Sequence, residues 1–213
     1  MDSKAAYHHG HLRQALVEAA LEAVAEGGVG SVSMADAARR AGVTAAAPYR
    51  HFASRQALVL ATAVETARAL DECLAAAEPA GPDPVELLAA SAAGYTSFYL
   101  ETGAGLDLIF LPELRALEDT ELADAGRRVM DRLLPAAQEL TGSAAAAIVL
   151  LEQVFAIAHG YAQLHEVPLT ARRLPTASAV AGAAADAVRL VATATAAASG
   201  INRPAPRRSA RST

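Results

Sequence analysis

Glycine and serine residues divide the first part of the chain into helical segments of very different length. Residues 9–26 carry leucine, valine and alanine at helical spacing and are followed by Gly27-Gly28, where left-handed backbone geometry costs little. Ser33 then precedes a short apolar-patterned segment, 34–41, which Gly42 ends. The pattern predicts a long amphipathic helix, a tight connection and a short helix with a serine cap.

The next residues predict a second short helix and then a second long one. Thr44 is placed to cap a helix that runs through His51, and Ser54 to cap a helix from 55 to about 77. A breaker stretch rich in proline, 78–84, follows. Two short helices joined by a tight turn that contains glycine, between two longer helices, form a helix-turn-helix motif.

The remainder of the chain predicts a larger helical body. Alanine and leucine dominate its apolar content, and aromatic residues make up only 4% of the chain, which favours helices over sheets. We expect an all-α fold of about nine helices, in which Pro112 and Pro135 kink or end the helices that contain them. The predicted body helices span roughly 85–102, 106–117, 119–140, 143–166 and 176–199. The expected division is a head, 1–60, a body, 61–200, and a disordered basic tail, 201–213.

Two of these predicted helices, 143–166 and 176–199, are too apolar all round to lie alone on a surface. Their many alanines allow helices to approach closely. They predict a homodimer in which each subunit gives two helices to a four-helix bundle. The alternative is a monomer that buries both helices in its own core.

The charge of the chain is unevenly distributed. The net charge of −5 divides into +1 for residues 1–60, −10 for 61–199 and +4 for 200–213. Only the head and the tail could therefore face a polyanion such as nucleic acid. The single cysteine, Cys73, excludes an intramolecular disulfide, and the N-terminus lacks the apolar core of a secretory signal, so we expect a cytoplasmic protein.

The sequence offers little for catalysis. His8, His9 and His11 lie near the N-terminus with no carboxylate or cysteine beside them, which is a poor metal site. No glycine-rich phosphate loop, Cys/His couple or nucleophile elbow is present. We therefore expect no enzyme activity, no metal and no cofactor.

The run YHHGHLRQALVEAALEAVAEGG, followed by SVSMADAARRAGVTAAAPYRHFASRQAL, resembles the N-terminal domain of TetR/AcrR-type transcriptional regulators. The resemblance covers about the first 60 residues. A second, shorter resemblance lies in VFAIAHGYAQL, where Ala158-His159-Gly160 is similar to the signature of the WHG-type C-terminal domain found in some members. An alanine stands where that signature has tryptophan.

The resemblance implies that the helix predicted for 44–51 is the recognition helix, which lies in the major groove of operator DNA. Alanine methyl groups there can contact thymine methyls or let the backbone approach the bases, and tyrosine, histidine and arginine can reach phosphates. Arg50 can read guanine or point at phosphate; both remain open. The DNA-contact residues implied are Ser33, Thr44, Ala45, Ala46, Tyr49, Arg50, His51 and Arg55.

The resemblance also implies a small-molecule pocket in the body, in which an effector binds and changes the affinity of the protein for DNA. The protein it implies is most often a repressor that binds a palindromic operator. The candidate lining residues of this pocket are Tyr95, Phe98, Tyr99, Phe110, Phe155 and His159. An aromatic residue at helical spacing is more often part of the core than of a pocket, so a place in the core is the alternative for each of them. The alternative function is a helical dimer whose helix-turn-helix serves as a protein-interaction module.

Overall fold

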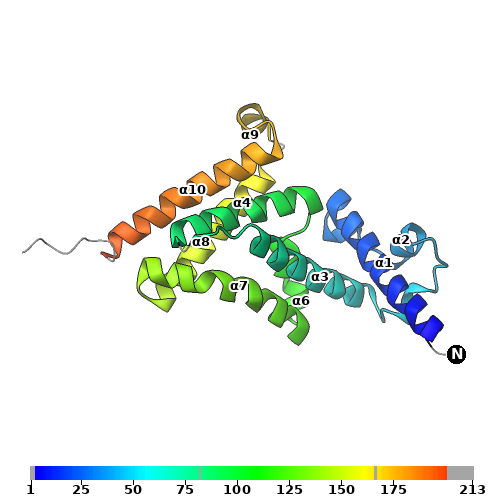
Figure 1. Ribbon diagram of the computed structural model, residues 1–213. Helices are drawn as coiled ribbons and strands as arrows, with labels where there is room; N and C mark the ends of the chain where they lie inside the picture. Colours follow the sequence, from blue (N-terminus) through cyan, green and yellow to red (C-terminus); the bar gives the residue numbers. More distant parts are fainter. Residues whose placement is uncertain (1–2, 82, 166, 201–213) are drawn as a thin grey trace, which may run out of the picture.

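The computed structural model describes residues 3–81, 83–165 and 167–200. Within these ranges every regular element is a helix, ten α-helices and two short 3₁₀ helices, and there is no strand (Figure 1). The all-α fold predicted from composition and periodicity is therefore confirmed. The basic tail predicted for 201–213 lies outside the described residues.

The head contains one long helix and three short elements. Ser33 caps α2 as predicted, because its side-chain oxygen accepts a hydrogen bond from the Asp36 backbone N–H at 3.1 Å. Gly42 follows α2 with φ of 66°, a left-handed conformation that glycine adopts without a steric penalty. The elements are α1 (Ser3–Gly27), η1 (Val29–Ser31), α2 (Met34–Arg40) and η2 (Pro48–Arg50).

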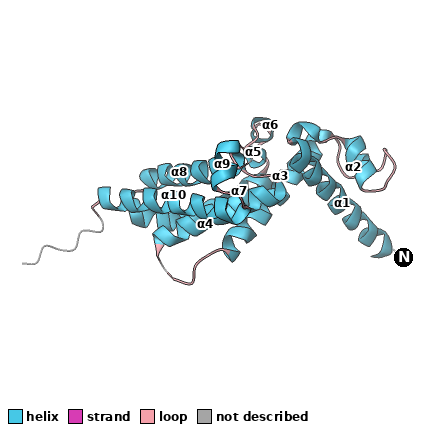
Figure 2. Ribbon diagram, turned by 90° about the horizontal axis from the view of Figure 1, so that it is seen from above, coloured by secondary structure: helices cyan, strands magenta, loops and turns pink. Residues whose placement is uncertain are grey.

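Helix α3 (Arg55–Ala76) links the head to the body. Ser54 caps it, as predicted, by accepting from the Ala57 N–H at 3.1 Å. Its first turns bury Leu58, its later turns bury Leu70, and it packs against both α1 and α7, so the apolar core continues from the head into the body along this helix. The two views show α1 and α2 on one side and the body on the other, with α3 running between them (Figures 1 and 2).

Four long helices build the body. α4 packs most extensively against α10, and α8 packs against α4, α7 and α10. Three short helices lie between the long ones. The long helices are α4 (Pro84–Thr102), α7 (Thr120–Thr141), α8 (Ala144–Gln163) and α10 (Ala177–Ala198); the short ones are α5 (Leu106–Ile109), α6 (Pro112–Arg115) and α9 (Pro168–Arg173).

The prolines of the body have different effects. The single helix predicted for 106–117 is divided into α5 and α6, because Leu111 takes an extended ψ of 125° before Pro112. Pro135, in contrast, does not end α7. It is exposed, and so is Asp131, so the carbonyl that loses its donor can bind water. The short helix α9 is not predicted by the sequence pattern at all.

Candidate nucleic-acid interface and small-molecule cavity

The segment 44–51 is not the α-helix that the sequence predicts. Residues 44–47 form a turn in which the Ala47 N–H donates to the Thr44 carbonyl at 2.9 Å, and η2 follows. In an α-helix that carbonyl would take the N–H of residue 48, but Pro48 has none. The Thr44 carbonyl instead accepts the N–H of a residue three positions on. The predicted α-helix over 44–51 is therefore wrong.

The side chains of this segment still divide into core and surface. Pro48 and Phe52 are buried, and the Arg13 guanidinium stacks on the Phe52 ring at 5.2 Å from its centroid. Tyr49 is 60% exposed, an uncommon position for a large aromatic side chain without a surface role. His51 is half-buried. The exposed residues of the predicted contact set are Ser33, Thr44, Ala45, Ala46, Tyr49 and Arg50.

The arginines of the head differ in how they are engaged. Arg40 binds the carboxylates of Asp36, Glu22 and Glu26, which fastens α2 to α1. These hydrogen bonds hold the pKa of Glu26 and of Asp36 below their ordinary values. The Arg50 side chain, in contrast, is exposed, and its guanidinium makes no ion pair or hydrogen bond with any residue that the structure describes. Arg50 is therefore available to a partner.

The side chain of Arg55 has a structural role that was not predicted from the sequence. Its Nε donates to the Val32 carbonyl at 2.8 Å, and its Nη2 donates to the Val29 carbonyl at 2.6 Å. Its Nη1 lies 3.8 Å from the Glu113 carboxylate of α6. Arg55 thus braces the turn before α2 from the first residue of α3. A phosphate contact by Arg55 stays a prediction.

A cavity of about 500 Å³ lies between α3, α5, α7 and α8. Three of the six predicted lining residues face it: Phe110, Phe155 and His159. Its remaining walls are almost entirely apolar, with Leu70 from α3 and Met130 from α7. Volume and lining agree with those of small-molecule sites, which span roughly 300–1,000 Å³.

Glu152 is a lining residue that the sequence analysis missed. It lies three residues before Phe155 and seven before His159, a spacing that places all three on one face of α8. A polar residue one turn before Phe155, on the face that also carries His159, was the available signal.

The other three candidates lie beside or away from the cavity. Tyr95 is fully buried behind His159, and its hydroxyl lies 2.8 Å from His159 Nδ1 and accepts the Leu106 N–H at 3.1 Å. Burial raises the pKa of Tyr95. The Tyr99 ring contacts the His159 ring edge-on, with centroids 5.1 Å apart. Phe98 is buried and does not line this cavity.

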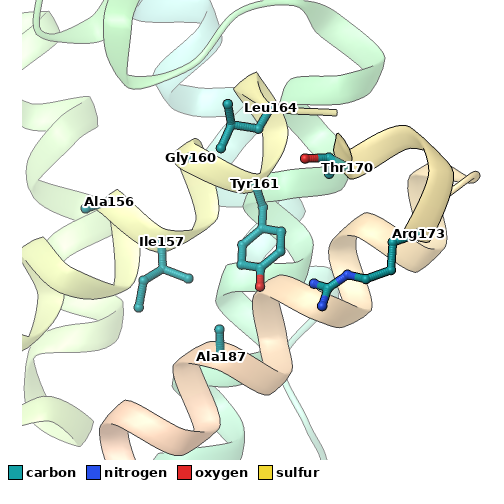
Figure 3. A pocket seen from close by; sticks show the side chains of 8 residues that line it. All are labelled: Ala156, Ile157, Gly160, Tyr161, Leu164, Thr170, Arg173 and Ala187. Carbon is teal, nitrogen blue, oxygen red and sulfur yellow. The ribbon is translucent and has the colours of Figure 1, made fainter. Parts of the chain in front are cut away.

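A second cavity, of about 590 Å³, lies between α8, α9 and α10 (Figure 3). Its floor is formed by small and apolar side chains such as Ile157 and Ala187. The Tyr161 ring and the Arg173 side chain extend from α8 and α9 toward α10. This cavity opens on the outer face of α8 and α10.

That outer face carries exposed apolar side chains that have no partner in the described part of the chain, together with Asp186, which pairs with Arg189 at 2.6 Å. Leu190 is 74% exposed and Val149 52%, which is unusual for such side chains. Both helices are also long and apolar enough to cross a membrane by length and composition alone, with mean hydropathies of 1.5 and 1.3. Buried core helices of soluble proteins can have the same length and apolar composition. Both α8 and α10 contribute several buried residues to the core.

No group of three or more His, Cys, Asp or Glu residues in the described ranges is placed to hold a metal ion. Cys73 is half-buried, its thiol donates to the Gly94 carbonyl at 3.6 Å, and burial raises its pKa. A thiol in this setting stays protonated and is a poor nucleophile.

Fold and head together define an all-helical protein with an N-terminal helix-turn-helix-type unit and a larger helical body. The model of the family described as "Bacterial regulatory proteins, tetR family" matches residues 16–62. A solved structure of a protein of unknown function from Rhodococcus sp. RHA1 is 32% identical, with a TM-score of 0.65, and the match covers 87% of this chain and 97% of that one.

Two more distant solved structures share the fold. A TetR-like transcriptional regulator from Rhodococcus sp. RHA1 is 20% identical over 90% of this chain and 97% of that one, with a TM-score of 0.50. RolR in complex with resorcinol is 18% identical over 94% and 98%, with a TM-score of 0.52. No curated protein matches. The chain belongs to the TetR family of DNA-binding regulators, which confirms the family resemblance; the WHG-type resemblance around His159 stays a prediction.

Proposed function

We propose that this TetR-family regulator binds a palindromic operator as a homodimer and represses transcription until a small molecule enters the cavity between α3, α5, α7 and α8. The observation that carries the proposal is the group of exposed side chains Thr44, Ala45, Ala46, Tyr49 and Arg50 on the head, within the region that the family model matches. Tyr49 and Arg50 are exposed there beside three small side chains, which leave room for close approach to DNA.

Two subunits would join through the outer face of α8 and α10. Glycine in the middle of a helix costs about 1 kcal/mol relative to alanine, yet Gly160 and Gly182 have nothing within 4 Å of the position a Cβ would take. No contact inside the described chain therefore requires glycine there. A second subunit packing closely against this face would supply the reason, and it would cover Val149 and Leu190.

The cavity is connected to the head through α5 and α6. Leu106, Ile109 and Phe110 line the cavity, and α6 follows directly. The backbone carbonyl of Glu113 in α6 accepts a hydrogen bond from Gln56 of α3 at 3.2 Å, one residue from the Arg55 brace. A ligand that shifts α5 would therefore move the contacts that hold the start of α3 and the head.

Such a ligand changes DNA affinity only as far as it binds the two arrangements of the dimer unequally. RolR, which shares the fold, is bound to resorcinol, and this supports the expectation that the fold can hold a small molecule. The effector of this chain need not resemble resorcinol.

In vitro selection of DNA from a random-sequence pool, with purified protein at near-physiological salt, tests the proposal. Recovery of a palindrome with half-sites about one helical turn, roughly 34–36 Å, apart is the expected result. Enrichment of an asymmetric site would contradict the homodimeric mode of binding. A folded, dimeric protein that enriches no sequence, with or without cavity ligands, would contradict DNA recognition.

That last result would favour the alternative, a helical dimer whose head binds another protein. Such a module would show no steep salt dependence of DNA affinity. The family also supports a protein that acts without catalysis in the cytoplasm, which is where a regulator meets its operator.

A further inference from the structure

The cavity between α3, α5, α7 and α8 has one charged side chain among the described residues that line it, Glu152. Glu152 is exposed at the cavity and forms no ion pair with any described residue. Two arginines of the neighbouring α7 are engaged with carboxylates instead: Arg127 lies 2.9 Å from Asp124, and Arg128 lies 4.0 Å from the Asp71 carboxylate. The lining therefore carries a negative charge and no arginine or lysine.

His159, the other polar residue of the lining, adds no positive charge in the observed arrangement. The Tyr95 hydroxyl already accepts the Leu106 N–H, so its own proton needs an acceptor, and His159 Nδ1 lies 2.8 Å away. A fully buried hydroxyl that found no acceptor would lose the free energy of a hydrogen bond. With Nδ1 accepting, the ring proton of a neutral His159 is on Nε2, which lies 3.3 Å from the terminal side-chain amide of Gln163; that amide accepts the proton when its oxygen is the atom turned toward the ring.

We propose that the cavity selects a largely apolar molecule that is cationic or uncharged and discriminates against a carboxylate or phosphate of the same size. This inference rests on the proposed function, in which the cavity is the effector site. The Glu152 carboxylate attracts a cation and repels an anion at the cavity. An anion would also lose its hydration among apolar walls without gaining a cationic partner.

Three probes on one naphthalene framework separate charge from shape: 2-(1-naphthyl)ethylamine, 2-(1-naphthyl)ethanol and 1-naphthylacetate. Titration calorimetry on the full chain at neutral pH gives their dissociation constants. The amine should bind about tenfold more tightly than the carboxylate, with the alcohol between them. A carboxylate that binds as tightly as the amine would overturn the inference, and so would a protein that binds none of the three.

Variants locate the effect. Glu152→Gln should bring the three probes to within about threefold of one another, about 0.6 kcal/mol. Glu139→Gln makes the same change of charge at an exposed position of α7 outside the lining and should leave the order intact. Gly126→Leu should abolish binding, because Gly126 lines the cavity and its Cβ position has nothing within 4 Å. An unchanged order in Glu152→Gln, or unchanged binding in Gly126→Leu, would overturn the assignment.

Operator binding measured with and without the amine keeps the two proposals distinct. Probes that bind in the expected order but leave operator affinity unchanged would contradict the effector role and leave the selectivity standing. An operator that responds to the carboxylate and not to the amine would contradict the selectivity and leave the regulator standing.

Discussion

The guanidinium of Arg55 donates to the backbone carbonyl of Val32 at 2.8 Å, which joins the first residue of α3 to the residue before the cap of α2. A second bond, to the Val29 carbonyl, doubles the connection. Since α3 also packs against α7 in the body, the position of the head depends on this junction. Arg55 is a structural brace, whether or not it also contacts DNA.

Arg55→Ala should lower the free energy of unfolding by about 1.5–3 kcal/mol, because two carbonyls lose a charged donor. Arg50→Ala is the matched control; it removes an exposed arginine that has no partner among the described residues and should change stability by less than about 0.5 kcal/mol. Chemical denaturation measures both. Equal stability of the two variants would show that the brace contributes nothing.

Tyr49→Ala should weaken operator binding by about tenfold or more with little effect on stability, since Tyr49 is 60% exposed. Tyr49→Phe tests the hydroxyl separately, because it retains the ring and loses only the hydroxyl that is proposed to donate to a phosphate. Fluorescence anisotropy with a labelled operator gives the affinities. A folded Tyr49→Ala protein that binds as tightly as wild type would place the DNA contact elsewhere on the head.

Leu190→Asp should convert the proposed homodimer to monomers, because it places a charge in its proposed interface, the outer face of α8 and α10. Leu117→Asp makes the same change at an exposed leucine after α6 and should leave the dimer intact. Sedimentation velocity distinguishes the two states. A Leu190→Asp protein that remains dimeric would show that the subunits meet through another face.

Gly105→Ala should destabilise the body by about 1–3 kcal/mol, because the new Cβ would lie 2.5 Å from the Tyr95 hydroxyl and force Tyr95 or α5 to move. Gly126→Ala is the control, with open space at its Cβ position and a gain in helix propensity. Thermal unfolding should rank Gly105→Ala below wild type and Gly126→Ala at or above it. The reverse ranking would contradict the close contact at residue 105.

The ion pairs of Arg40 predict a pH dependence of head stability. In the folded protein the pKa of Glu26 lies below its ordinary value of 4.5, and the pKa of Asp36 lies below its ordinary value of 3.8. The two ionised carboxylates therefore stabilise the fold at pH values above these ordinary pKa values. The contribution is lost as pH falls below 4.5 and through the lowered folded-state values.

Arg40→Met should therefore be less stable than wild type at pH 7, and the difference should shrink as pH falls below about 4.5. Urea unfolding at pH 7 and at pH 3 measures the difference. A difference that is the same at both pH values would mean that packing, and not the carboxylates, makes Arg40 stabilising.

Local signals in the sequence were sufficient for the starts of α2 and α3. Ser33 and Ser54 cap α2 and α3 because capping depends on residues three positions apart. The α-helix predicted for 44–51 was wrong because Pro48 has no N–H, so the Thr44 carbonyl accepts the N–H of residue 47 instead. The local backbone constraint of Pro48 therefore decides the structure of this segment.

The cavity could be predicted only in part. Phe155 and His159 share a face of α8 and were correctly predicted to line the cavity. Tyr95 and Phe98 are on α4, and residue spacing does not predict how α4 is rotated against α8. The Arg55 brace and the Gln56 contact with Glu113 join residues more than twenty positions apart. Contacts of this kind follow from tertiary packing.

The affinity of the purified protein for its selected palindrome, measured at several salt concentrations against a scrambled duplex, tests the central claim most directly. The logarithm of the association constant should fall linearly with the logarithm of salt concentration, and the palindrome should bind at least about a thousandfold more tightly than the scrambled duplex at physiological salt. Equal affinity for both duplexes at every salt concentration would contradict a sequence-specific regulator.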